Sequence, residues 1–226
     1  MAPVGSGDTR RSSGCPPARA SEPQSATGAA VDLVASTMIT STAAVTSGED
    51  PLAIRRIVKF GDPVLGTPTM RVAGIDDEIR LLVRDMVETM YAAPGIGLAA
   101  NQIGVSLRVA VIDVTAGQEQ GHLIVMINPQ VIEHEGKQVE EEGCLSIPGF
   151  TEFVTRPARA IVRATDLEGQ EFTMEGRELL ARAFCHETDH LDGKLFIERL
   201  AGIKRQLITK RVRKAVDAGD WNEIYP

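Results

Sequence analysis

The stretch His186-Glu187-Thr188-Asp189-His190 places two imidazoles four residues apart, with a carboxylate directly after the first. On an α-helix, side chains four residues apart lie on the same face, about one turn from each other. Two neutral histidines in this arrangement can bind one divalent metal, and Glu187 lies close enough to move protons to and from an attacking water. The stretch therefore predicts metal-assisted hydrolysis.

The residues just before this stretch have apolar side chains at helical spacing: Leu179, Leu180, Ala183 and Phe184. This pattern is typical of a helix with one face in the core. Gly193 is a plausible end for that helix. A solvated helix face that carries the motif by chance is the alternative, but two of the chain's four histidines fall in this one pentapeptide.

The third metal ligand has to come from elsewhere in the chain. In one large class of metalloproteases a third histidine follows six residues later, but Phe196 stands there. A thermolysin-like site needs a later glutamate. Glu198 is too close along the chain to fold back, and Glu223 lies near the end of the sequence. We therefore expect the ligand to lie upstream.

The three cysteines supply upstream candidates. Cys15 lies in a low-complexity leader, and Cys185 would point to the far side of the helix from His190, about 100° around from His186. Cys144 remains, followed by a turn signal at residues 147–149 (IPG). Taken alone it could be a small buried hydrophobic residue. A Cys-His-His set with one open position has the form of a catalytic metal site.

A third segment, residues 95–104, reads GIGLAANQIG and lacks the ending of a phosphate-binding loop. Together with residues 142–146 (EGCLS) and 186–190, in this order, it closely resembles the peptide deformylase family. The resemblance covers roughly Pro51 to the end of the chain. One position departs from the family, which usually has glutamine where this chain has Cys185. Since that side chain should face away from the metal, we expect altered packing there and retained activity.

The resemblance implies a role for each motif residue. The metal ligands would be Cys144, His186 and His190. The residues that act on the substrate would be Glu187 as the acid and base, the Gln102 side chain and the Leu145 backbone N–H as oxyanion donors, Gly97 as a backbone partner of the peptide, and Ile96 and Leu179 as the lining of the methionine pocket.

The implied reaction is the removal of the formyl group from N-formylmethionine at the start of new polypeptides, which yields formate and a free amino terminus. The resemblance also implies Fe²⁺ as the metal, with Zn²⁺, Ni²⁺ or Co²⁺ able to replace it, since a Cys-His-His set suits several of these ions. A thiolate ligand to iron predicts inactivation by oxidation.

Composition indicates one catalytic domain, residues 49–226, after a low-complexity extension, residues 1–48, that we expect to be disordered. Arginines among serines in the extension are typical of an organellar transit peptide, but its acidic residues weaken that interpretation, and translation from Met38 is an alternative. We expect no membrane span, since no apolar stretch approaches about 20 residues. The need for a reduced cysteine indicates the cytoplasm.

The expected fold is α+β, with antiparallel β-sheets around a central metal-binding helix and a helix at the C-terminus. We expect helices at residues 76–91 and 200–218 in addition to the metal helix. The expected strands are residues 108–114, 122–127, 131–140, 150–155 and 160–165, with a hairpin turn at 116–121 and another turn at 166–169. His122 and His134 fall in these strand and loop regions and are expected to be non-catalytic.

The last helix carries six basic residues in a chain of net charge −7: Lys204, Arg205, Lys210, Arg211, Arg213 and Lys214. A solvated helix face is one interpretation, and contact with ribosomal RNA near the nascent chain is the other. The acidic remainder argues against specific DNA binding. Two other functions are alternatives: a metallopeptidase that cuts internal bonds, and a binding protein that has lost the chemistry.

Overall fold

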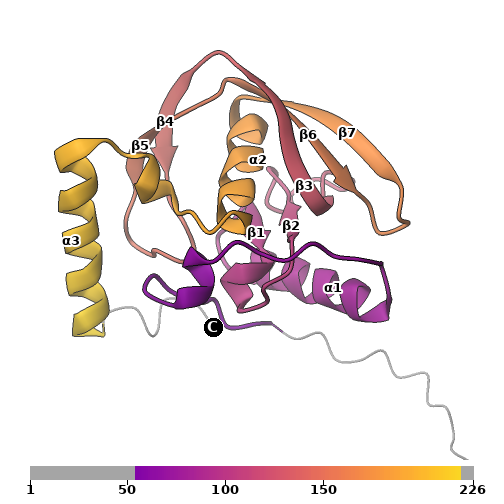
Figure 1. Cartoon of the computed structure of the whole chain (residues 1–226), viewed down its shortest axis with the longest axis horizontal. Helices are drawn as coiled ribbons and strands as arrows, with labels where there is room; N and C mark the ends of the chain where they lie inside the picture. The colour runs from indigo at the N-terminus through magenta and orange to yellow at the C-terminus, as the bar shows by residue number, and fades with distance from the viewer. Residues whose placement is uncertain (1–53, 220–226) are drawn as a thin grey trace, which may run out of the picture. The chain divides into compact units, whose positions relative to one another are not determined.

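Figure 1 shows the computed structural model of the chain, which describes residues 54–219. This part of the chain forms three α-helices, seven β-strands and three short 3₁₀ helices. Their bounds are η1 Pro63–Gly66, α1 Asp77–Ala92, β1 Gly97–Ala99, η2 Ala100–Ile103, β2 Val109–Ile112, β3 Ile124–Glu135, β4 Gln138–Glu142, β5 Glu152–Arg156, β6 Arg159–Thr165, β7 Glu171–Arg177, α2 Glu178–Leu191, η3 Phe196–Arg199 and α3 Gly202–Ala218.

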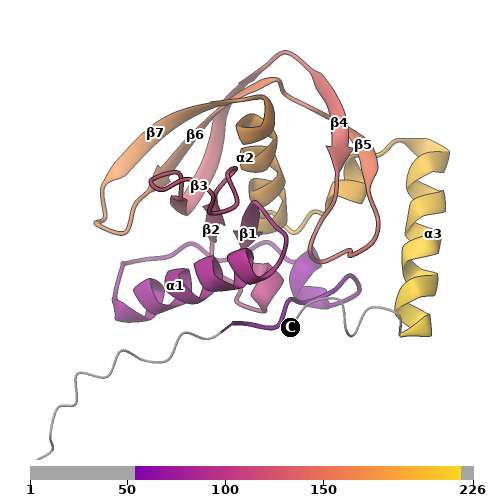
Figure 2. The same cartoon turned by 180° about the vertical axis from the view of Figure 1, so that it is seen from behind.

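Two antiparallel sheets surround α2. The larger sheet has the strand order β1-β2-β3-β6-β7, and β4 and β5 form a separate pair. In Figures 1 and 2, α2 lies between the β4–β5 pair and the larger sheet, and it contacts β6, β7, β1, β2 and β3. The prediction of antiparallel sheets around a central helix, with a helix at the C-terminus, is confirmed.

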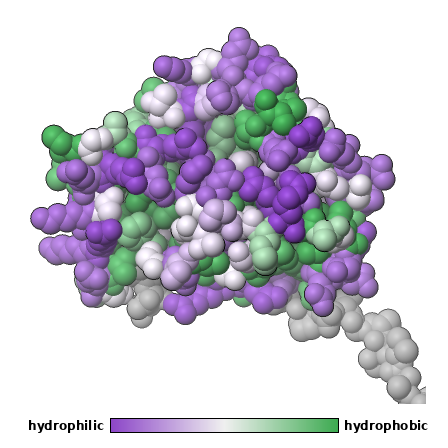
Figure 3. All heavy atoms as spheres, in the orientation of Figure 1, coloured by the Kyte–Doolittle hydropathy of each residue, from purple (hydrophilic) through white to green (hydrophobic). Residues whose placement is uncertain are grey.

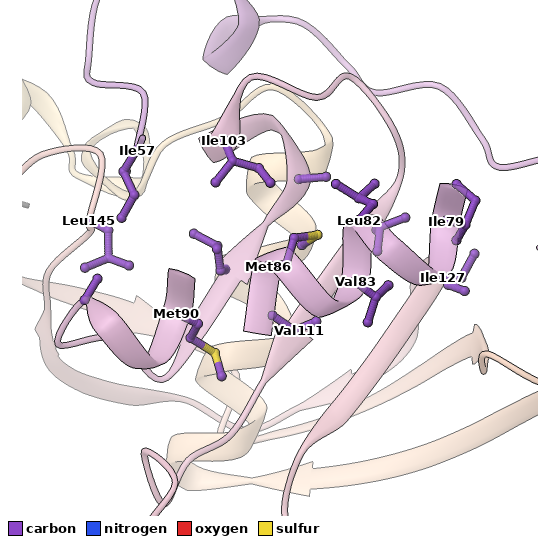
Figure 4. Close-up of a cluster of buried hydrophobic side chains, with 14 of the residues drawn as sticks. Ile57, Ile79, Leu82, Val83, Met86, Met90, Ile103, Val111, Ile127 and Leu145 are labelled. Carbon is purple, nitrogen blue, oxygen red and sulfur yellow. The ribbon is translucent and has the colours of Figure 1, made fainter. Parts of the chain in front are cut away.

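The core begins with α1, which starts where the sequence indicates. The Asp76 side chain accepts a hydrogen bond from the backbone N–H of Ile79 at 3.0 Å and so satisfies one of the free donors of the first turn. Figure 4 shows Leu82, Val83 and Met86 of α1 among the buried side chains of this cluster. Burial of such side chains provides most of the free energy that holds the helix to the sheet.

Two further apolar clusters fix the helices that follow. One packs α2 on the larger sheet and includes Phe184 and Leu191, both with no exposed surface. The other joins α3 and η3 to the β4–β5 side, where Ile208 and Val212 are the buried residues of α3. Because α2 is packed on the larger sheet through fully buried side chains, the residues on its other face have little freedom to shift.

The strands differ from the sequence prediction in several places. Residues 122–127 and 131–140 were expected to be separate strands, but β3 runs continuously from Ile124 to Glu135. Asn128, with φ of 55°, and Pro129 lie at a register shift that bends the strand without ending it. The chain instead turns at Gly136, with φ of 67°. Strands β1 and β7 were not predicted.

The surface is mostly hydrophilic in the view of Figure 3, and polar side chains gather along the edge where Figure 1 places α3. Within residues 54–219, no helix is long and apolar enough to cross a membrane. The expectation of a disordered extension at residues 1–48 lies outside the described residues.

Candidate active site

Three potential metal ligands converge on α2 and the loop that follows β4. The ligand atoms of Cys144, His186 and His190 all lie within 4.8 Å of one another. The Cys144 Sγ is 3.2 Å from the His190 Nε2, and that nitrogen is 3.2 Å from the His186 Nε2. A sulfur and two imidazole nitrogens at such spacing match the donor set of a divalent transition metal, so the group supports a metal cofactor.

Helix α2 supplies the two histidines because of its period. His186 and His190 are four residues apart and share one face, as expected from the sequence. The backbone carbonyl of His190 accepts a hydrogen bond from the Asn101 side chain at 2.6 Å, which ties η2 to the end of α2. Gly193 follows with φ of 72°, and a side chain there would collide with the backbone of Gly66. The ligand-bearing end of α2 is therefore fixed from outside the helix.

Gln102 points its amide nitrogen toward the ligands. Its Oε1 accepts a hydrogen bond from the Ala99 N–H at 2.9 Å, and its Nε2 then faces the Ser146 Oγ at 3.3 Å and the Cys144 Sγ at 3.6 Å. Since Oε1 is bonded to the backbone, Nε2 is the end of the amide that faces the ligands, where it donates to Ser146 and Cys144. Within the described part of the chain, the backbone N–H of Leu145 makes no hydrogen bond, so this donor is free.

Glu187 is a buried carboxylate next to the ligands. One of its oxygens, Oε2, has no hydrogen-bond partner among the described residues. Burial raises the pKa of Glu187 to about 7, which suits a group that must both accept and return a proton near neutral pH. Gly97 lies against this side chain, and a β-carbon at residue 97 would be only 2.9 Å from the Cδ of Glu187.

A buried ionic network lies behind the ligands. Arg156 donates to both carboxylate oxygens of Glu142, at 2.8 and 3.0 Å, and to Asp189 at 2.5 Å. Glu142 in turn lies 3.2 Å from the Nδ1 of His186, and Asp189 also pairs with Arg199. Burial opposes ionisation of Glu142, but His186 and Arg156 outweigh it and hold the Glu142 pKa at about 2. The Glu142 carboxylate is therefore ionised, and its contact with Nδ1 fixes the orientation of the His186 ring.

The network was not anticipated from the sequence. Glu142 and Asp189 stand inside two of the quoted motifs, within two residues of Cys144 and His190, so their positions were visible. Their common partner, Arg156, lies on β5 and carries no local signal. An arginine with 3% exposure has to be paired, but only the fold shows with what.

A pocket of about 320 Å³ opens in front of the ligands. Among its lining residues are the predicted Gly97, Gln102, Cys144, Leu145, His186 and Glu187, together with Ile96 and Leu179. Every site residue expected from the sequence except His190, which is 1% exposed, thus borders this space. A small peptide end can reach the ligands through this opening.

Cys185 and the two remaining histidines lie apart from this group. Cys185 borders a separate cavity, about 580 Å³ in volume, that also contains His134 and Arg156. Burial raises the pKa of the Cys185 thiol to about 11. His122 pairs with Glu119 at 3.1 Å. None of these three residues belongs to the ligand group found in residues 54–219.

Helix α2 presents His186 and the buried Glu187 to the pocket, with His190 behind them and Cys144 from a separate loop. Such a set is typical of metal-dependent hydrolases. The family that matches the chain is described as "Polypeptide deformylase", and the match spans residues 54–206. The chain belongs to the polypeptide deformylase family. Its reaction is the removal of the formyl group from N-formylmethionine at the start of new polypeptides.

Relatives of known name agree with this assignment. A peptide deformylase of Acidobacterium capsulatum is 52% identical over 170 residues, which cover 75% of this chain and all of the relative. The crystal structure of a peptide deformylase from Legionella pneumophila is similar with a TM-score of 0.69 and 39% identity, over 74% of this chain and 98% of that one. A peptide deformylase from Synechococcus elongatus, solved in complex with actinonin, has a TM-score of 0.66 and 38% identity, over 75% and 89% of the two chains.

Proposed function

We propose that deformylation takes place at the Cys144–His186–His190 group, with Glu187 as the general acid and base. The convergence of these three ligand atoms within 4.8 Å, next to a buried carboxylate, carries this proposal. The ion that they would hold supplies Lewis-acid chemistry. The proposal also assigns residues 49–226 as the catalytic domain.

Side chains and backbone groups of the pocket carry out proton transfer and stabilise the oxyanion. Glu187 takes a proton from the water that attacks the formyl carbon, and delivers it to the amine when the carbon–nitrogen bond breaks and formate leaves. The Leu145 N–H, which has no partner among the described residues, donates to the oxyanion that forms in between. The Gln102 Nε2 joins it by exchanging one of its hydrogen bonds to Ser146 and Cys144.

The substrate peptide is held by backbone and by apolar contacts. Strand β1 is the last strand of its sheet, so the backbone of Gly97 is free to pair with an added strand. Ile96 and Leu179 line the same pocket and would contact the methionine side chain.

The assay that tests this proposal compares formyl-Met-Ala-Ser with a peptide that is blocked at both ends. The wild-type protein is expected to release formate from the first peptide and to leave the second intact, whereas a metallopeptidase would cut the second. Glu187→Ala should abolish formate release while metal content stays near one ion per chain. Undiminished activity of Glu187→Ala would contradict the role of this residue, and a wild-type protein without activity would indicate a binding protein.

We further propose Fe²⁺ as the native metal, with Zn²⁺, Ni²⁺ or Co²⁺ as replacements, because a thiolate and two imidazoles suit these borderline ions. Metal analysis of protein purified without oxygen tests this. An iron-loaded protein should lose activity in air as the metal or the Cys144 thiolate is oxidised. A site that depends on a reduced thiol fits a reducing compartment, and we propose the cytoplasm as the location.

For α3 we propose transient contact with ribosomal RNA. Its basic side chains are largely exposed, and Arg211 also lies over the ring of Phe150, 5.5 Å from its centre. Charge reversal at Arg211 and Arg213 should weaken ribosome binding at low salt, with the difference shrinking as salt is added. Unchanged ribosome affinity of that double variant would refute the contact.

A further inference from the structure

One cation shares the active-site face of α2. Among the residues that line the pocket are Leu179, Arg182, Ala183, His186 and Glu187. The spacing of three, one, three and one residues is that of a single helix face, so Arg182 lies one turn before His186 and on the same side. Apolar or chemically active residues occupy the other four positions.

The charge of Arg182 is not balanced within the described residues. Its one hydrogen bond among those residues runs from Nη1 to the backbone carbonyl of Glu141, at 3.4 Å, and no carboxylate there lies within 4.0 Å of its guanidinium. The carboxylates nearby have other partners. Glu142 is paired with Arg156, and Glu141 accepts a hydrogen bond from the Thr151 hydroxyl at 2.6 Å. Arg182 thus presents a free cation to the pocket.

From its position on α2, Arg182 would lie near the substrate residues that follow the methionine. This step rests on the proposed function, in which the formyl group meets the ligands and the peptide leaves through the pocket. One helical turn advances about 5.4 Å, and an extended peptide advances about 3.3 Å per residue. With the added length of its own side chain, Arg182 can reach the second and third residues of the substrate.

We propose that Arg182 is a specificity-determining residue that favours an acidic side chain at the second or third position of the formylated peptide. Glu141 lies at the same rim and would attract a basic side chain instead. It is exposed, however, whereas Arg182 is half-buried, and solvent screens the exposed charge more strongly. The attraction of Arg182 for acidic side chains therefore outweighs the attraction of Glu141 for basic ones.

The test uses four amidated peptides: formyl-Met-Asp-Ala, formyl-Met-Lys-Ala, formyl-Met-Ala-Asp and formyl-Met-Ala-Lys. For the wild type, kcat/KM at low salt should be about two- to fivefold higher with aspartate than with lysine at one position or both, the range expected of a partly exposed ion pair. Arg182→Gln should bring the ratio to one or below, and Arg182→Glu should reverse it. Because each ratio is measured within one variant, a smaller folded fraction does not affect it.

The matched control is Arg163→Gln, which removes an exposed arginine on β6 that lies outside the pocket. It should keep the wild-type ratio. A neutral peptide, amidated formyl-Met-Ala-Ser, separates this inference from the proposed function: no turnover of that peptide would refute the function itself. Turnover of it together with a ratio that Arg182→Glu leaves unchanged, or a wild-type preference for lysine, would overturn the role of Arg182 alone.

Discussion

The Glu187 side chain occupies the space that a β-carbon of residue 97 would fill. A carbon there would come within 2.9 Å of the Glu187 Cδ, although the two residues lie 90 positions apart in the chain. The family resemblance accounts for Gly97 as a backbone partner of the substrate peptide. The structure adds a second reason, since the glycine makes room for the carboxylate.

Gly97→Ala is therefore expected to displace Glu187 and to lower kcat/KM by about a hundredfold, the size of effect that an error near 1 Å in a reacting group produces. Formate release and metal content measure this. Gly74→Ala is the control, because a β-carbon at Gly74 meets nothing within 4 Å and should leave the rate unchanged. Wild-type activity in Gly97→Ala would show that Glu187 can adapt.

Arg156→Met should destabilise the protein by about 3–5 kcal/mol, because it leaves the buried carboxylates of Glu142 and Asp189 without their shared partner. Metal affinity should fall by about ten- to a hundredfold, since His186 loses its oriented carboxylate. Urea unfolding and competition with a chelator measure the two effects. Arg163→Met, at an exposed position, should change neither. An unchanged metal affinity would contradict the link through Glu142.

Alkaline pH should remove the contribution of Tyr91, whose hydroxyl donates to Asp113 at 2.8 Å. Partial burial, and then this hydrogen bond, raise the pKa of Tyr91 to about 12. A raised pKa means that the stabilisation is complete below the unfolded pKa of about 10 and is lost as pH rises through 12. Tyr91→Phe should be less stable than the wild type by about 1 kcal/mol at pH 8, and this gap should close towards pH 12. A gap that is constant with pH would refute the assignment.

Glutamine at position 185 should be tolerated, because Cys185 borders the 580 Å³ cavity and not the substrate pocket. We expect Cys185→Gln to keep its metal and to retain activity within about twofold, because the cavity has room for the longer side chain away from the reacting groups. Ala183→Gln places the same side chain on the pocket face of α2 and should block the substrate. Metal loss in Cys185→Gln would show that the thiol supports the ligands.

The parts of the fold that the sequence predicted are those with strong local patterns. Helix α1 has a capping aspartate and a clear apolar stripe, and α2 carries its ligands at a spacing that only a helix makes useful. Strand β1 has three residues and was hidden in a glycine-alanine run. Strand β7 exposes every second residue and ends directly at α2, so its pattern merged with that of the helix.

The same distinction holds for the site. The ligands and Glu187 belong to short motifs, whose residues are close in sequence or of rare type. The Glu142–Arg156–Asp189–Arg199 chain of contacts joins four separate elements, and no spacing in the sequence indicates which arginine meets which acid. Arg182 also lies in a helix that the sequence predicts, but nothing in the sequence indicates that its guanidinium has no carboxylate nearby.

The open side of β1 has a consequence for how copies of this protein behave in concentrated solution. Unpaired backbone on a terminal strand can recruit a neighbouring molecule and seed aggregates. Here that strand stops after three residues, where the chain coils into η2 at Ala100. A strand of this length can pair with one flexible chain end during a reaction. It offers too few backbone hydrogen bonds to hold two folded copies together.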